Sequence, residues 1–215
     1  MVLLHGTFGL TNWGVIEQAL SAGGYSVYPF DYGNGGTEEI GRSAGALARF
    51  IQDVLARTGA KRVSVIGHSQ GGLMARYYVK SLGGNAHVDD LIALSPPNHG
   101  TMNLFAQAGW FECEACAEQQ AGSPFLANLN EGQEAPGPVD YTVIQTRYDV
   151  VVVPYTSAFL SGPPDRVTNI TLQERCPSGF VDHVNIPSDP VALQWIENAL
   201  GHAGPADPGS AAPRC

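Results

Sequence analysis

The sequence has little charge and almost no lysine. Only 14% of its 215 residues are charged, against about 25% in an average globular chain. Lysine occurs only as Lys61 and Lys80, and the 20 acidic residues leave a formal net charge of −9. Because nucleic acids and anionic membranes attract basic surfaces, this composition argues against both as partners. An uncharged ester or lipid stays compatible with it.

Long apolar runs are also missing. No segment approaches the about 18 apolar residues that span a membrane, and no signal peptide stands at the start. The apolar residues directly after Met1 indicate a shortened start, from which we expect a signal peptide and leading segment to have been removed. With 44% hydrophobic residues, the chain is long enough to bury one core. We expect a single domain over 1–201 and a tail over 202–215.

Cysteine is scarce but even in number. The 4 cysteines allow three pairings, and two disulfides would suit an oxidising compartment. We favour Cys113–Cys116 and Cys176–Cys215, because two intervening residues permit a small loop and a cysteine ending a proline- and glycine-rich tail needs an anchor. A zinc site is disfavoured because the sequence has no second close pair of cysteines beside Cys113 and Cys116. A thioredoxin-type redox site is also disfavoured, because this pair lies in an irregular stretch and not directly after a strand. We expect no metal.

Apolar strands and amphipathic helices alternate along the chain, which predicts an α/β fold with a largely parallel sheet. The expected strands are 1–4, 25–29, 62–66, 90–94, 141–146 and 167–172, and the expected helices are 12–22, 37–58, 70–82 and 190–200. The stretch 95–137 has no clean period and is too long for a plain loop, so we expect functional surface there. The tail after residue 202 has nothing to bury.

The pentapeptide Gly-His-Ser-Gln-Gly at 67–71 comes between an expected strand and an expected helix. This order is typical of a nucleophile elbow, in which a strand turns sharply into a helix and exposes a serine at the turn. We predict Ser69 as the nucleophile. A second match to the pattern, at 41–45, lies inside an amphipathic helix that Thr37 would cap, and we interpret its Ser43 as helix surface.

A serine nucleophile needs a base, which is itself oriented by an acid, and in such a fold the acid precedes the base in the chain. Asp149 directly follows the fifth expected strand, and His183 lies in the loop after the sixth. The other histidines precede the acid or fall at the end of the last helix. Asp140 stands at the wrong end of its strand, and Asp182 adjoins the histidine and would point away from it. Asp149 and His183 are therefore the predicted acid and base.

The loop after the first expected strand, which begins His-Gly-Thr, offers the other half of such a site. A backbone N–H from this loop, paired with that of the residue after the nucleophile, forms an oxyanion hole. We assign these donors to Thr7 and Gln70.

Several apolar residues near these loops could form a wall for an acyl chain, with plain core packing as the alternative for each. They are Phe8, Met102, Leu104, Phe105, Val152, Val184 and Ile186. A lid over 102–106 is the less favoured interpretation, because a lid usually needs a longer segment.

These motifs together resemble the secreted actinobacterial lipases and esterases and, more distantly, the minimal bacillus-type lipases. The resemblance covers about residues 2–200 and rests on His5-Gly6-Thr7, Gly67-His68-Ser69-Gln70-Gly71-Gly72, Asn98-His99-Gly100-Thr101, Tyr148-Asp149 and the loop from Cys176-Pro177 to His183. It implies a minimal α/β-hydrolase fold of about six mostly parallel strands, carboxylic ester hydrolysis, secretion and no cofactor. The same triad and oxyanion residues follow from it, and in similar yeast-type lipases the threonine hydroxyl is a third donor. We expect the leader that is usual in this family to have been removed from this sequence.

Three rival functions use the same scaffold: polyesterase, thioesterase and acyltransferase. A catalytically silent hydrolase fold that only binds a ligand is disfavoured, because every candidate for the triad and the oxyanion hole is present. We expect a monomer that meets an ester or lipid substrate, with a lipid–water interface as a further partner.

Overall fold

The structure is a computed structural model that describes residues 1–103, 113–210 and 213–215. Within these residues, six strands form one sheet in the order β2-β1-β3-β4-β5-β6, and every neighbouring pair is parallel. The strands are β1 (Val2–Leu4), β2 (Tyr28–Phe30), β3 (Val63–His68), β4 (Val88–Leu94), β5 (Asp140–Gln145) and β6 (Val167–Thr171). The sheet and its helices form the predicted α/β-hydrolase fold.

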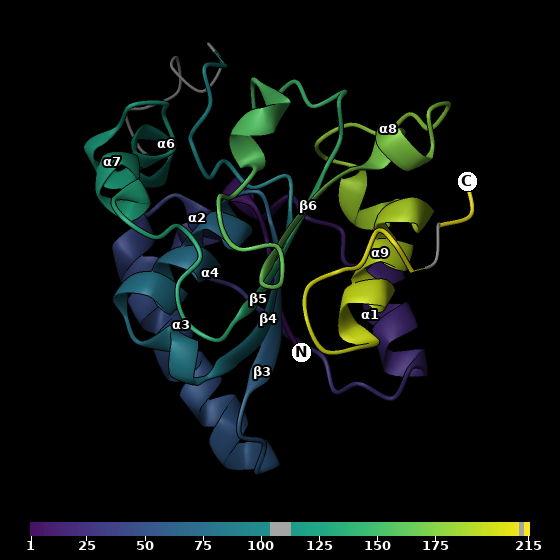
Figure 1. Ribbon diagram of the computed structural model, residues 1–215. Helices are drawn as coiled ribbons and strands as arrows, with labels where there is room; N and C mark the ends of the chain where they lie inside the picture. The colour runs from purple at the N-terminus through teal and green to yellow at the C-terminus, as the bar shows by residue number, and fades with distance from the viewer. Residues whose placement is uncertain (104–112, 211–212) are drawn as a thin grey trace.

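Helices cover both faces of the sheet (Figure 1). The α-helices are α1 (Gly14–Ala22), α2 (Gly33–Gly36), α3 (Ile40–Thr58), α4 (Gln70–Ser81), α6 (Glu114–Glu118), α7 (Pro124–Asn130), α8 (Leu172–Arg175) and α9 (Pro190–Leu200). Short 3-10 helices are η1 (Thr7–Gly9), η2 (Gly84–Ala86), η4 (Tyr155–Ala158) and η5 (Ile186–Ser188). In Figure 1, α3 and α4 lie on one side of the sheet, with α1 and α9 on the other.

The strand sequences explain why both faces are covered. Successive side chains of a strand point to opposite faces, so a strand that is apolar at every position buries both of them. In β1, Val2 and Leu4 pack in the core that α3 and α4 cover, whereas Leu3 packs in the core with α1 and α9. The sheet therefore separates two hydrophobic cores.

Parallel strands bring their carboxyl ends to one edge of the sheet, where ligand and catalytic groups gather in open α/β folds. The loops that follow β1, β3, β5 and β6 all begin at this edge. The loop carrying Thr7, the elbow serine and the loops carrying Asp149 and His183 follow these four strands in turn.

The start of α3 differs from the prediction. Thr37 does not cap the helix, because its hydroxyl donates to the Asn34 carbonyl, and α3 begins three residues later at Ile40. The carboxylates of Glu114 and Glu118 accept the backbone N–H groups of Glu39 and Ile40 instead. These partners are distant in the sequence, so local capping rules do not find them.

Ser43 lies inside α3, as predicted, but its assignment to the helix surface is wrong. The residue is only 2% exposed. Its hydroxyl faces Gly33, where an added Cβ would lie 2.4 Å from Ser43 Oγ. The irregular turn at α2 folds over this side of the helix, so Ser43 is buried beneath backbone.

The segment 95–137 and the tail hold more structure than expected. Helices α6 and α7 fall in the former, and the two disulfides are Cys113–Cys116 and Cys176–Cys215, the favoured pairing. The tail does bury a residue, contrary to expectation: Ala206 is 1% exposed, and its N–H donates to Thr142 Oγ1 on β5. Among the described residues, no helix combines the length and the apolar character that membrane spanning requires.

Candidate active site

Ser69 stands at a sharp turn between β3 and α4. Its backbone has φ 52° and ψ −123°, a conformation that L-residues rarely adopt outside strained functional turns. The flanking glycines are required by space. A Cβ on Gly71 would lie 2.3 Å from the Leu4 carbonyl oxygen, and one on Gly67 would lie 2.4 Å from the Gly72 nitrogen. The pentapeptide therefore folds as an elbow.

A continuous chain of hydrogen bonds joins Ser69, His183 and Asp149. His183 Nε2 lies 3.0 Å from Ser69 Oγ, and His183 Nδ1 lies 2.7 Å from Asp149 Oδ2. All three residues are buried. Because the carboxylate only accepts, the imidazole donates through Nδ1 and presents the Nε2 lone pair to the serine hydroxyl.

Asp149 is held as a carboxylate by its surroundings. Burial alone would raise the pKa of Asp149, but the hydrogen bond and charge of His183, with the N–H groups of Val152 and Val151, outweigh it and lower the pKa below its usual value. Those two N–H groups bind Oδ1 at 2.7 and 2.8 Å, while Oδ2 faces the imidazole. The two oxygens thus have different partners: Oδ1 accepts from the backbone of its own loop, and Oδ2 accepts from the imidazole.

A second buried histidine connects the elbow to the other loops. His68 Nε2 donates to the backbone carbonyl of His183 at 2.8 Å, and Thr11 Oγ1 donates to His68 Nδ1 at 2.8 Å. Thr11 Oγ1 in turn accepts the N–H of Gly6 at 2.8 Å. Burial lowers the pKa of His68 to about 3, so this ring stays neutral and can both donate and accept.

Thr7 and Gln70 flank the serine from two different segments. Gln70 begins α4, and the first N–H groups of a helix have no partner within it. The loop bearing Thr7 approaches closely, since a Cβ on Gly6 would lie 3.1 Å from Ser69 Cβ. The Thr7 hydroxyl donates to Gln70 Oε1 at 2.6 Å. The two residues predicted as oxyanion donors therefore lie close to Ser69, Thr7 in the loop after β1 and Gln70 at the start of α4.

A cavity of about 300 Å³ opens onto Ser69 and His183. Its wall is mostly apolar and includes Phe8, Leu10, Val151, Val152 and Val184. A cavity of this kind suits an uncharged hydrocarbon chain placed next to a polar reacting group.

The sequence model of the family Lipase (class 2) matches residues 1–196. The chain belongs to the class 2 lipase family.

Curated relatives of this class 2 family member match it over shorter segments. It is 37% identical over 112 residues to a triacylglycerol lipase of Pseudomonas fragi, covering 47% of this chain and 35% of that lipase. It is 34% identical over 85 residues to a triacylglycerol lipase of Pseudarthrobacter phenanthrenivorans, covering 36% of this chain and 27% of that lipase. The matched segments thus span about a third or less of these relatives.

Two solved structures match this chain over nearly its whole length. Lipase B of Aspergillus fumigatus has a TM-score of 0.86 and 26% identity, covering 98% of this chain and 54% of that one. Bacillus licheniformis lipase BlEst2 in its propeptide form has a TM-score of 0.71 and 17% identity, covering 98% and 52%. The second likeness bears on the fold alone.

The prediction of the acyl wall is partly wrong. Phe8, Val152 and Val184 line the cavity, but Ile186 does not. Ile186 is fully buried in the core beneath α1 and α9, because η5 turns the chain inward directly after the histidine loop. Met102 is 59% exposed and is not among the described residues that line the cavity. Leu104, Phe105 and most of the segment 102–106 lie outside the described residues.

The two aspartates that the sequence analysis set aside as the acid have other partners in the structure. Asp140 binds Arg166 Nη1 at 2.9 Å, and Asp182 accepts from Asn185. Sequence reasoning missed Gln119, which lines the cavity beside Thr7. Nothing in the sequence near Gln119 marks it, because its position depends on how α6 packs against distant segments.

Proposed function

We propose that this chain hydrolyses carboxylic esters, with triacylglycerols or shorter acyl esters as substrates, through a serine acyl-enzyme. The observation that carries the proposal is the hydrogen-bond chain from Asp149 through His183 to Ser69, which ends at an apolar cavity. Triads are recognised by this geometry and by the roles of their members. The class 2 lipase match and the triacylglycerol lipases among its relatives support the same activity.

The reaction proceeds in two acyl transfers. Ser69 Oγ attacks the ester carbonyl carbon while His183 Nε2 takes the hydroxyl proton, and the carbonyl electrons move onto oxygen. The N–H groups of Thr7 and Gln70 bind this oxyanion. Collapse of the intermediate expels the alcohol, which receives the proton from His183. Water then attacks the acyl-enzyme by the same route, releasing the acid and free serine.

A series of p-nitrophenyl esters from acetate to palmitate, with covalent labelling by a phosphonate ester, tests this function. We expect turnover that rises with acyl length as the chain fills the apolar cavity, and a single label on Ser69. Absence of ester turnover, or a label on another serine, would contradict the proposal. Thioesters and an alternative acceptor alcohol in the same assay distinguish the thioesterase and acyltransferase alternatives.

Replacing Thr7 with valine tests its hydroxyl as a third oxyanion donor, because the backbone N–H survives the change. Removing one preorganised donor costs about 10²–10³ in turnover, and a third donor matters somewhat less, so we expect a loss of about 10- to 300-fold, mainly in kcat. Thr7→Ser restores the hydroxyl and should retain most of the activity. If Thr7→Val keeps the wild-type kcat on a short ester, only the backbone role remains.

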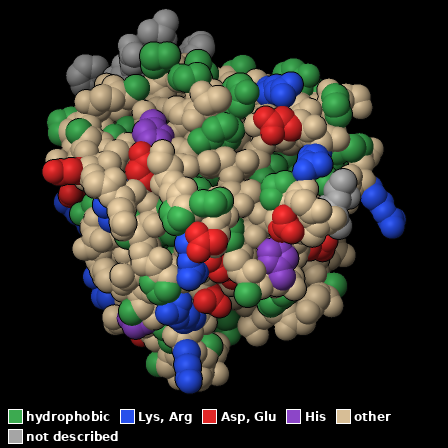
Figure 2. Space-filling model, in the orientation of Figure 1, with side chains coloured by type: hydrophobic (Ala, Val, Ile, Leu, Met, Phe, Trp, Pro, Cys, Tyr) green, Lys and Arg blue, Asp and Glu red, His purple; other side chains and the backbone are tan. Residues whose placement is uncertain are grey.

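We propose in addition that the cavity mouth docks on an uncharged lipid surface. Phe8, Leu10, Val151 and Val184 line the cavity and are also exposed. Phe180, which is 75% exposed, packs its ring 4.7 Å from that of Tyr148, the residue before Asp149. Figure 2 shows hydrophobic side chains along the upper edge of the molecule. The net charge of −9 favours a neutral lipid over an anionic one.

Phe180→Ser separates docking from chemistry. Since an exposed aromatic contributes apolar area to a lipid surface, we expect hydrolysis of emulsified tributyrin to fall by about 5- to 20-fold while turnover of dissolved p-nitrophenyl acetate stays unchanged. The matched control is Leu82→Ser, another exposed apolar residue, at the end of α4. Equal losses on both substrates, or equal losses in both variants, would refute the docking proposal.

The two disulfides support an extracellular location for such an enzyme.

A further inference from the structure

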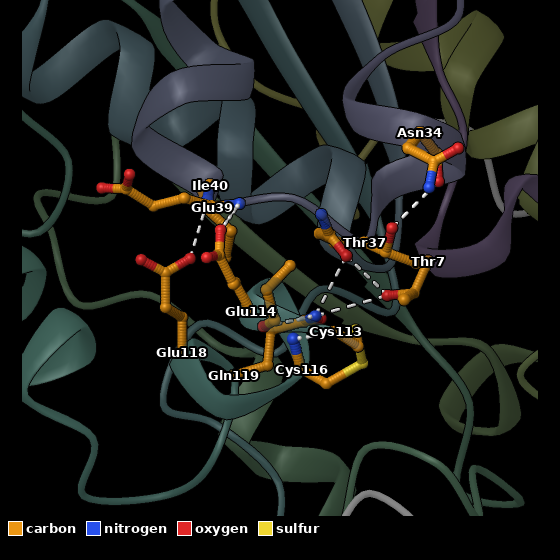
Figure 3. The surroundings of a disulfide bond; sticks show 12 residues. Thr7, Asn34, Thr37, Glu39, Ile40, Cys113, Glu114, Cys116, Glu118 and Gln119 are labelled. Atoms are coloured by element: carbon orange, nitrogen blue, oxygen red, sulfur yellow. Dashed lines mark hydrogen bonds between the residues drawn. A yellow bond between two sulfur atoms is a disulfide. The ribbon is translucent and has the colours of Figure 1, made fainter. Parts of the chain in front are cut away.

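One side-chain amide joins three segments at the oxyanion site. Gln119 directly follows α6 as its C-cap and is buried. Its Nε2 lies 3.0 Å from Gln70 Oε1 and 3.3 Å from Thr7 Oγ1. The same nitrogen donates to the Ala115 carbonyl at 3.0 Å, which fixes the orientation of the amide. Figure 3 shows the Gln119 side chain directed from α6 toward Thr7.

In this structure the Thr7 hydroxyl already donates its proton to a neighbouring side chain. The hydroxyl donates to Gln70 Oε1, so it must turn away from that oxygen to donate to an oxyanion. Leaving a buried acceptor without any donor costs about 1–3 kcal/mol of free energy, and this cost would oppose the rotation of the Thr7 hydroxyl. Gln70 Oε1 has a second donor in Gln119, and it therefore stays hydrogen-bonded when the Thr7 proton leaves.

We propose that Gln119 is a positioning residue that enables the Thr7 hydroxyl to serve the oxyanion; the proposal rests on the function proposed above. One amide proton of Gln119 is bound by the Ala115 carbonyl, and the other is shared between Gln70 Oε1 and Thr7 Oγ1, so Gln119 keeps Gln70 Oε1 hydrogen-bonded and also donates to the Thr7 hydroxyl. A hydroxyl that accepts one hydrogen bond becomes a stronger donor in the next, because such bonds polarise one another. Gln119 itself does not touch the substrate in this role and acts through Thr7.

The surroundings of α6 hold Gln119 in place. The Cys113–Cys116 disulfide closes the first turn of the helix, and the Ala115 N–H donates to the Thr37 carbonyl at 3.2 Å. The Glu114 and Glu118 carboxylates accept N–H groups at the start of α3. Figure 3 shows these contacts gathered around the disulfide, on the side of α6 that faces Thr37 and Thr7. The helix is therefore anchored at both of its ends, and this holds the Gln119 amide within hydrogen-bonding distance of its partners.

A double-mutant cycle between Gln119 and Thr7 tests the proposal. Gln119→Met keeps the length of the side chain and removes its hydrogen bonds, so we expect kcat on p-nitrophenyl acetate to fall by about 5- to 30-fold with KM nearly unchanged. In the Thr7→Val background the same change should cost less than about twofold, because no hydroxyl remains to be positioned. Gln52→Met, at an exposed position of α3, is the matched control and should change neither constant.

Equal losses in both backgrounds, or an unchanged kcat in Gln119→Met, would overturn the proposal. If Gln119→Met does not fold, Gln119→Asn replaces it in the cycle, because asparagine keeps the amide on a shorter side chain. The loss of kcat that Gln119→Asn causes must likewise disappear in the Thr7→Val background. Ser69-dependent ester turnover in the wild-type protein tests the proposed function separately. If that turnover is present and the cycle is additive, only the role of Gln119 fails.

Discussion

Replacing Ser69 with alanine is expected to lower ester turnover by about 10⁵- to 10⁶-fold. The change removes the atom that attacks the carbonyl, and loss of a serine nucleophile from a triad costs about as much as loss of the whole triad. The oxyanion donors and the cavity remain, so substrate binding and the residual activity that they support should persist. Steady-state kinetics on a soluble ester and loss of phosphonate labelling measure the effect.

The control for this experiment is the other serine of the same pattern. Ser43 Oγ is buried with no hydrogen-bond partner, so Ser43→Ala should leave both turnover and folding nearly unchanged. A crippled Ser43→Ala variant, or an active Ser69→Ala variant, would contradict the assignment of the nucleophile.

Asp149→Asn is expected to lower turnover by about 10⁴-fold. An asparagine can still accept the N–H groups of Val151 and Val152 through its amide oxygen, so the loop should stay folded. Its NH₂ group would then face His183 Nδ1, which favours the tautomer with the proton on Nε2. That proton removes the lone pair that Ser69 needs, and the imidazolium formed during the reaction loses its counter-charge. Circular dichroism and kcat/KM together separate folding from catalysis.

Two other aspartates provide the comparison. Asp140→Asn and Asp182→Asn should each cost less than about tenfold, because Asp140 binds Arg166, Asp182 binds Asn185, and neither hydrogen-bonds to the imidazole. If Asp182→Asn proved to be the damaging change, the assignment of the acid to Asp149 would be wrong.

The fold was predictable because its signals are local. Apolar strands followed by helices dictate a parallel sheet, and such a sheet brings the loops carrying Ser69, Asp149 and His183 to one edge. Even the boundaries of β1 and α9 need little correction, since their apolar patterns are uninterrupted. Chain order and strand ends were enough to single out the three side chains that the structure joins by hydrogen bonds.

The residues that sequence reasoning misplaced depend on contacts between distant segments. Ile186 and Val184 are two residues apart and both apolar, yet Ile186 is buried in the core and Val184 lines the cavity, because η5 begins at Ile186 and turns the chain inward. Ser43 is buried by the turn at α2 rather than by its own helix. Gln119 reaches Thr7 only after α6 has packed against the start of α3. The hydrophobic periodicity of the sequence therefore does not predict where these three side chains lie.

The Cys176–Cys215 disulfide has a consequence for how the protein would survive proteolysis. The two cysteines are 39 positions apart, and the segment between them contains His183 and all of α9. A protease that cuts one peptide bond within this segment leaves both fragments covalently joined. The severed piece stays tethered at a high effective concentration, so it can reoccupy its place against the sheet. A molecule nicked between Cys176 and His183 should therefore migrate as one chain until it is reduced, and only then lose the fragment that carries the imidazole.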